Sequence, residues 1–307
     1  MAREHTGAAG ADHDIVIHVE HRYAEVNGIR MHYVTAGAGQ LVLFAHGFPE
    51  FWYEWRRQLA EFGRDHQAVA PDLRGYNLTS KPVGVEQYRV KLLIEDLRGL
   101  AAHLGAERFV LVAHDWGGAV AWAFALAHPE LLEKLVIINA PHPGIFAREV
   151  HSNPAQQHAS QYMRMFCTLE AEEILSRDDY KTLIDMALGH GLKRGYFDNA
   201  DKQAYIEAWS QPGALTGGLN YYRASRLIPP PPGTPIGSEL ELDVEALTVH
   251  VPTLVIWGDR DTALLPGNLE GLEQFVPDLT IRRIPDANHW VVHQKPELVN
   301  QYIREFL

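Results

Sequence analysis

Phe109-Val-Leu-Val-Ala-His-Asp-Trp-Gly-Gly118 is a stretch in which an apolar run leads directly into a charged residue and two glycines. The run Phe109–Ala113 predicts a buried strand, and the small residues of Ala119–Ala127 predict a helix. A strand, a sharp turn and a helix are the setting of a nucleophile elbow, which exposes the side chain at its tip. Asp115 occupies that tip. A solvated aspartate in an ordinary turn is the alternative, and the flanking strand and helix favour the elbow.

An aspartate at the tip, where the usual pattern has serine, changes the expected chemistry. A carboxylate with an ordinary pKa of about 3.9 is ionised at neutral pH without the help of a base. It attacks saturated carbon and forms an alkyl ester on the enzyme. We therefore expect Asp115 to be a covalent nucleophile for an alkylating substrate.

Other apolar runs on both sides of the elbow predict further strands. Asn27-Gly28 is a strong turn dipeptide and predicts a hairpin ahead of them. Helical spacing of leucines predicts a helix over 87–104. Alternating strands and helices indicate an α/β fold with a mostly parallel sheet covered on both faces. The expected strands are 23–26, 30–34, 41–45, 68–70, 109–113, 135–138, 253–257 and 279–284.

The strand–helix alternation stops after Pro141 and returns at Val251. Between them the chain is mostly helical in pattern, with helices expected at 171–175, 180–188 and 202–209. The prolines of 229–232 predict a stiff connector. The expected organisation is an α/β core over 1–141, a helical cap over 142–245 and the rest of the core over 246–307. Residues 1–14 are expected to be a loose tail.

Composition excludes several functional classes. The net charge of −12 disfavours binding to nucleic acid or anionic membranes. There is no run of 18 apolar residues and no signal-peptide pattern, and the single cysteine, Cys167, permits no internal disulfide. We expect a soluble cytoplasmic protein. The sequence has no Cys/His cluster, HExxH run or Gly-rich dinucleotide fingerprint, so neither a metal nor an organic cofactor is expected.

Three further segments supply candidates that would complete the site of Asp115. Acids follow the expected strand 253–257, where an orienting carboxylate would lie; Asp261 is the choice and Asp259 its competitor. His289, on the loop after the last strand, is the candidate general base. The order Asp115, Asp261, His289 is that of nucleophile, acid and histidine in this class of fold. After strand 41–45, the backbone N–H of Phe48, together with that of Trp116, would form an oxyanion hole.

At this point the chain resembles the soluble bacterial epoxide hydrolases of the α/β-hydrolase fold, in their aspartate-nucleophile branch. The resemblance is carried by HGFPEFWYEWR (46–56), APDLRGYNLTSKP (70–82), VAHDWGG (112–118), WGDRD (257–261) and ANHW (287–290). It implies an enzyme that converts an apolar epoxide and water to a vicinal diol. It also implies two cap tyrosines that stabilise the epoxide oxygen, matched by Tyr162 and Tyr222, with Tyr221 as the competitor of Tyr222. Phe48, Trp116 and Tyr221 are expected to line the substrate pocket.

Three alternative functions remain. A haloalkane dehalogenase would use the same Asp115, His289 and Asp261. Phe48 stands where many such enzymes have a halide-binding asparagine, and Trp116 stands where fluoroacetate dehalogenases usually have arginine. A ligand-binding receptor on a hydrolase scaffold, from a different functional class, could also keep an intact triad. A serine esterase is the weakest alternative because no serine stands at the elbow.

Overall fold

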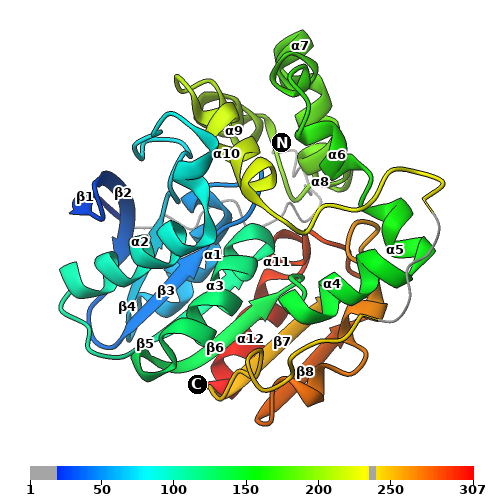
Figure 1. The fold of residues 1–307 in the computed structure, drawn as a ribbon. Coiled ribbons are helices and arrows are strands. Elements are labelled where there is room, and N and C mark those ends of the chain that lie inside the picture. The colour runs from blue at the N-terminus through cyan, green and yellow to red at the C-terminus, as the bar shows by residue number, and fades with distance from the viewer. Residues whose placement is uncertain (1–18, 235–239) are drawn as a thin grey trace, which may run out of the picture.

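An eight-stranded sheet forms the centre of the protein in the computed structural model, which describes residues 19–234 and 240–307 (Figure 1). The strand order is β1-β2-β4-β3-β5-β6-β7-β8. β1 and β2 form an antiparallel hairpin, β2 pairs antiparallel with β4, and the remaining pairs are parallel. The strands are β1 (Glu20–Val26), β2 (Ile29–Ala36), β3 (Leu41–Ala45), β4 (Gln67–Pro71), β5 (Phe109–His114), β6 (Leu132–Ile138), β7 (Thr253–Gly258) and β8 (Leu279–Ile284).

The central strands are buried on both faces, which explains their continuous apolar runs. Because successive side chains of a strand point to opposite faces, β5 contributes to two separate cores. Leu111 and Ala113 pack in the core beneath α2 (Val90–His103) and α3 (Asp115–Ala127). Val110 and Val112 pack in the core beneath α1 (Arg56–Phe62) and α12 (Pro296–Phe306). The sheet is thus a layer between two layers of helices, as the sequence predicts.

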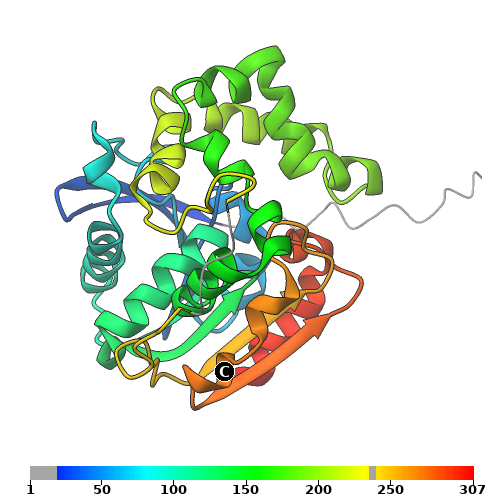
Figure 2. The same cartoon turned by 45° about the vertical axis from the view of Figure 1, so that its right-hand side comes forward.

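Helices form the long insert between β6 and β7 (Figures 1 and 2). α4 packs against α3 and the segment Pro266–Leu269, whereas α6 to α10 lie above the sheet. The helices are α4 (Pro143–Ser152), α5 (Pro154–Ala159), α6 (Tyr162–Phe166), α7 (Ala171–Leu183), α8 (Gly189–Arg194), α9 (Asn199–Trp209) and α10 (Ala214–Ala224).

The two ends of the insert meet at its base. His142, at the start of α4, donates a hydrogen bond from Nε2 to the carbonyl oxygen of Leu247 over 3.0 Å. Its Nδ1 accepts a hydrogen bond from the Gly144 N–H over 3.3 Å. Both contacts require neutral imidazole with the proton on Nε2.

All eight expected strands are present, and several are longer than expected. The helix expected at 87–104 begins only at Val90, after a 3₁₀ turn at Val85–Tyr88. The helices expected at 171–175 and 180–188 correspond to α7 and a π-helical turn, Ile184–Leu188. Residues 177–180 of α7 leave helical geometry. The expected tail over 1–14 lies outside the described residues.

Candidate active site

Asp115 stands at a tight elbow between β5 and α3, near the middle of the sheet. Its φ angle is +48°, in the left-handed region, which costs a residue with a Cβ about 1–2 kcal/mol. The packing around it holds this conformation. A Cβ on Gly117 would lie 2.3 Å from the carbonyl oxygen of Ala45, so only glycine lets α3 approach β3 this closely. The elbow therefore depends on the glycine as well as on the aspartate.

The loop after β3 lies directly over Asp115. A Cβ on Gly47 would lie 2.3 Å from the Cβ of Asp115, so this position also needs glycine. The next residue, Phe48, donates its backbone N–H to Oδ1 of Asp115 over 2.7 Å. Trp116, the other expected donor, follows Asp115 directly, but its N–H makes no hydrogen bond to the carboxylate in the structure. The geometry thus shows one of the two expected donors in place.

His289 and Asp261 complete the core side of the site. His289 Nε2 lies 3.5 Å from Oδ2 of Asp115, and Nδ1 lies 2.7 Å from Oδ2 of Asp261. Asp261 is held by the N–H groups of Ala263 and Leu264, at 2.8 and 2.9 Å, and by the Asn139 amide at 2.8 Å. These bonds leave Asp261 one orientation, in which it faces the imidazole.

The competitor Asp259 has a different setting. Its carboxylate pairs with Arg283 at 2.8 Å, whereas the Asp261 side chain is fully buried against His289. Of the two acids, the structure brings only Asp261 to the histidine.

The surroundings of Asp115 favour its ionised form. Burial opposes ionisation of Asp115, but the hydrogen bond and charge of His289, the charge of His114 and the Phe48 N–H hold its pKa below the usual range. Burial would lower the pKa of His289, but Asp261 and Asp115 raise it well above the usual value. In the resting site the two groups therefore form an ion pair.

A second buried histidine lies behind the first, and sequence reasoning missed it. The rings of His114 and His289 are 4.7 Å apart, and His114 Nε2 donates to the carbonyl oxygen of His289 over 2.9 Å. His114 Nδ1 lies 2.6 Å from Oε1 of Glu54, and both side chains are fully buried. Burial lowers the pKa of His114, but Glu54 outweighs burial and raises it. The only sequence signal was that His114 precedes Asp115.

The insert contributes two tyrosines opposite the carboxylate. Tyr162 of α6 and Tyr222 of α10 line the same cavity as Asp115, and their rings lie 6.3 Å apart. Burial raises the pKa of both hydroxyls, and the nearby Asp115 carboxylate adds to the shift. Both phenols are therefore protonated at neutral pH and can donate hydrogen bonds.

Tyr221 differs from Tyr222 in the hydrogen bonding of its hydroxyl group. The Tyr221 hydroxyl donates to the carbonyl oxygen of Arg74 over 2.9 Å and is fully buried, although its ring lines the cavity as expected. Tyr222 instead packs edge-on against Trp116, with ring centroids 5.0 Å apart. Of the two adjacent tyrosines, Tyr221 is therefore the one whose hydroxyl is committed to the protein backbone.

The cavity has a volume of about 880 Å³ and an apolar lining that includes Trp116 and Tyr221. Phe48, which the sequence also predicts in this lining, is not among the residues that line the cavity in the structure. The Phe48 ring packs against Phe166 and Tyr222, at 5.2 and 5.4 Å, and borders a separate small pocket instead. This follows from the turn at Gly47, which directs the backbone N–H of Phe48 toward Asp115 and its ring into the cap.

A buried polar cluster joins the cap to the core beside the site. Tyr205 of α9 donates to Oε2 of Glu50, and His293 Nε2 donates to Oε1 of Glu50 over 3.0 Å. All three residues are buried. His293 thus pairs with a buried carboxylate of the core.

Among residues 19–234 and 240–307, no group of three or more His, Cys, Asp or Glu side chains is placed to hold a metal ion. In the same ranges, no helix is long and apolar enough to cross a membrane.

Comparison with known proteins identifies the family. Residues 40–296 match the α/β hydrolase fold family. The chain is 39% identical over 293 residues to the AB hydrolase superfamily protein YfhM of Bacillus subtilis, with 94% of this chain and 98% of that protein covered. It is 37% identical over 294 residues to epoxide hydrolase 2 of Caenorhabditis elegans, with 94% and 79% covered.

Among solved structures, two variants of an epoxide hydrolase from Bacillus megaterium superpose with TM-scores of 0.86 and 0.84, at 39% and 37% identity. Each alignment covers 93% of this chain and 99% of that one, and the second structure holds the product (R)-3-[1]naphthyloxy-propane-1,2-diol. The chain therefore belongs to the α/β-hydrolase-fold family. Within that family it is an epoxide hydrolase.

Proposed function

We propose that the chain converts epoxides to vicinal diols through a covalent hydroxyalkyl ester on Asp115. The observation that carries the proposal is the placement of Tyr162 and Tyr222, two protonated phenols, in the same cavity as the ionised Asp115. Ring opening needs a nucleophile on one side of the carbon and a proton donor at the oxygen. The site offers both, and the diol-bound relative supports this assignment.

In the first step, Oδ2 of Asp115 is the attacking atom. Oδ1 already accepts the Phe48 N–H, whereas Oδ2 faces His289 and is the freer oxygen. Attack forms a C–O bond to one ring carbon and breaks the bond from that carbon to the epoxide oxygen. One of the two tyrosines gives its proton to that oxygen, and the other stabilises it by a hydrogen bond.

In the second step, His289 takes a proton from water, which attacks the Asp115 ester carbon. Esterification neutralises Asp115 and so removes one of the charges that raise the pKa of His289. The proton that His289 carries in the resting site then passes to the tyrosinate, which restores the phenol and leaves a neutral imidazole that can act as a base. The Phe48 N–H, joined by that of Trp116, stabilises the charge on Oδ1, a contribution of a few kcal/mol per donor. His289 gives the first water proton to the departing alkoxide of the diol, and the second returns to His289 as Asp115 regains its carboxylate; no cofactor takes part.

The boundaries of the insert and the setting of the enzyme belong to the same proposal. We assign 142–245 to a cap that covers the substrate, and 1–141 and 246–307 to the catalytic core. The His142–Leu247 contact supports this division, because it closes the insert at its base. The small-molecule substrate, the acidic surface and the single cysteine fit a cytoplasmic enzyme.

The test traps the intermediate. In His289→Ala the ester should form but not hydrolyse, so intact mass after exposure to an aryl epoxide should rise by the mass of the epoxide. Peptide mapping should place the adduct on the peptide containing Asp115. The double variant Asp115→Asn/His289→Ala is the matched control and should remain unmodified.

A parallel incubation with a primary bromoalkane separates the dehalogenase alternative. An adduct from the bromoalkane alone would move the protein to that class. If neither reagent leaves an adduct on Asp115, the covalent mechanism is wrong.

A further inference from the structure

The cavity above Asp115 changes in character between its inner end and its mouth. Asp115 and the two tyrosines line it together with buried or half-buried apolar side chains, which include Leu93, Ala119, Val120, Phe146 and Leu227. Its outer lining includes the exposed cations Arg89, Lys91 and Arg226. A three-membered ring fills little of about 880 Å³, so the lining beyond the ring bears on the rest of the substrate.

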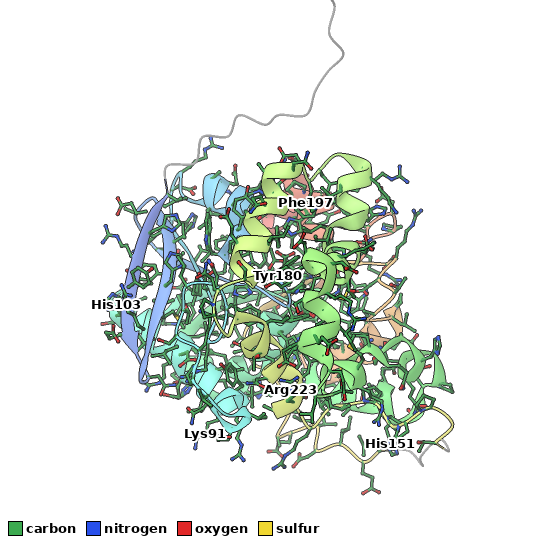
Figure 3. All side chains as sticks on the ribbon, turned by 90° about the horizontal axis from the view of Figure 1, so that it is seen from above. Lys91, His103, His151, Tyr180, Phe197 and Arg223 are labelled. Atoms are coloured by element: carbon green, nitrogen blue, oxygen red, sulfur yellow. The ribbon has the colours of Figure 1, made fainter. Side chains whose placement is uncertain are left out.

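The cations come from two elements that pack together. Arg89 and Lys91 flank the first residue of α2, just after the 3₁₀ turn Val85–Tyr88, and that turn contacts α10. Arg226 follows the end of α10. Figure 3 shows Lys91 and Arg223, which also lines the cavity, on the same side of the molecule. The mouth therefore gathers positive charge from both the core and the insert.

Three of these cations have no ion-pair partner within the described ranges. Arg223 is bound by Glu172, with contacts of 2.6 and 2.7 Å, so its charge is neutralised. Arg89, Lys91 and Arg226 make no such pair among residues 19–234 and 240–307. Glu86 is the acid in the cavity lining near them, and three cations outnumber it.

This local excess runs against the rest of the chain, which has a net charge of −12. The two cations at the start of α2 are also unfavourable for the stability of that helix. The amino end of a helix favours acids, yet the first turn of α2 has none and carries cations instead. These cations do not stabilise the helix and have no acid paired with them, so they are available to bind an anion that enters the mouth of the cavity.

We propose that Arg89, Lys91 and Arg226 form a subsite for an anionic group of the substrate. The preferred epoxides then carry a carboxylate, separated from the ring by an apolar segment that occupies the middle of the cavity. The inference rests on the proposed function, since it takes the ring to lie at Asp115. Exposed ion pairs contribute about 0.2–1 kcal/mol each, so each cation should contribute up to about fivefold in kcat/KM.

The test uses three matched epoxides that differ only at the far end of the same apolar chain: carboxylate, methyl ester and trimethylammonium. For the native enzyme, kcat/KM should be highest for the carboxylate, and its advantage should shrink as salt rises. The triple variant Arg89→Gln/Lys91→Gln/Arg226→Gln should lower kcat/KM for the carboxylate about tenfold or more. It should leave the ester within about twofold and favour the ammonium compound.

A control variant with the same change in net charge distinguishes a local subsite from the effect of the protein's overall charge. Arg64→Gln/Lys193→Gln/Arg194→Gln removes three cations that do not line the cavity. It should leave the preference for the carboxylate intact. Equal losses in both triple variants, or equal turnover of carboxylate and ester by the native enzyme, would overturn the subsite.

Binding of the corresponding diols gives a measurement that does not depend on turnover. Calorimetry should show the carboxylate diol binding more tightly than its methyl ester, and the mouth variant should abolish the difference. If no epoxide is opened but this difference is present, the proposed reaction fails and the anion subsite stands. If epoxides are opened but the two diols bind equally, the subsite fails and the reaction stands.

Discussion

The core side of the active site is held by hydrogen bonds, whereas the cap side is held by ring packing. Asp261 has donors on both carboxylate oxygens, and Asp115 has the Phe48 N–H. Tyr162 and Tyr222 instead lie among aromatic edges, with Phe166 5.3 and 4.9 Å from their respective rings. The core thus fixes the direction of each polar atom, and the cap fixes the shape of a cavity into which two hydroxyls project.

Because of this difference, a substitution in the core disturbs more of its surroundings than a substitution in the cap. In the core, replacing a polar atom also breaks the bonds that orient its neighbours. In the cap, Tyr→Phe removes a hydroxyl and leaves the ring packing in place. Substitutions in the two regions should therefore have different effects on rate and on stability.

The largest effect is expected for Asp115→Asn. The amide is a poor nucleophile, so kcat for diol formation should fall by about 10⁴-fold or more. Steady-state rates, together with intact mass to exclude deamidation, provide the measurement. Full activity in a protein shown to carry asparagine would refute the assignment of the nucleophile.

The next largest effect is expected for Asp261→Asn. Loss of the orienting carboxylate should slow hydrolysis of the ester by about 10³–10⁴-fold while the ester still forms. Rapid-quench measurement should therefore find the ester accumulating on the enzyme. Asp259→Asn is the matched control, because Asp259 pairs with Arg283 instead of His289. Equal losses in the two variants would show that net charge, and not the contact with His289, is responsible.

A smaller effect is expected for the two tyrosines. Tyr162→Phe and Tyr222→Phe should each lower the rate of ester formation by about 10²–10³-fold, since each removes a proton donor at the epoxide oxygen. Tyr221→Phe is the control. It should retain the rate within a few-fold and cost about 1 kcal/mol of stability, because its hydroxyl bonds to the Arg74 carbonyl. If Tyr221→Phe slowed ester formation and Tyr222→Phe did not, Tyr221 would be the proton donor and Tyr222 would not.

The smallest effect concerns stability, at the junction of the two regions. Burial lowers the pKa of His142 to about 4, although its bond to Leu247 opposes the shift. Because this folded pKa lies below the unfolded value of about 6.5, the unfolded chain binds the proton first. The stability that neutral His142 contributes is present above pH 6.5 and should fall by about 3 kcal/mol as the pH drops to 4.

Chemical denaturation across this pH window measures the effect. His142→Gln cannot titrate and should flatten the dependence of unfolding free energy on pH. The exposed cap histidine His158 is the control, and His158→Gln should keep the native slope. Identical slopes in the native protein and in His142→Gln would contradict the assignment.

The core was largely predictable because its signals are local. The apolar runs of β3 and β5 and the residues just after them specify both the strands and the edge of the sheet where Asp115, Asp261 and the Phe48 loop meet. Asn139 follows β6 in the same way, so the same signal would have found it. The buried Glu54–His114 pair was not predictable, because no periodicity relates residues 60 positions apart that meet only after folding.

The cap was less predictable because its short helices are defined by packing. α6 has only five residues, too few for a helical period to show, and its tyrosine came from a resemblance to known sequences. The order Tyr221-Tyr222 in α10 likewise could not show which hydroxyl the Arg74 carbonyl would bind. That distinction depends on the rotation of α10 over the core, which a single sequence does not reveal.

The hydrogen bond between His142 and Leu247 spans 105 positions of the chain. The insert therefore leaves the core and returns to it at one point, so it is joined to the core as a single unit. Because closing a loop costs only about 0.6 kcal/mol more for each doubling of its length, inserts of very different size can occupy this point at similar cost. Proteins with this architecture can therefore differ in the insert that covers the cavity, and so in the molecules that enter it, while the sheet that carries Asp115 stays the same.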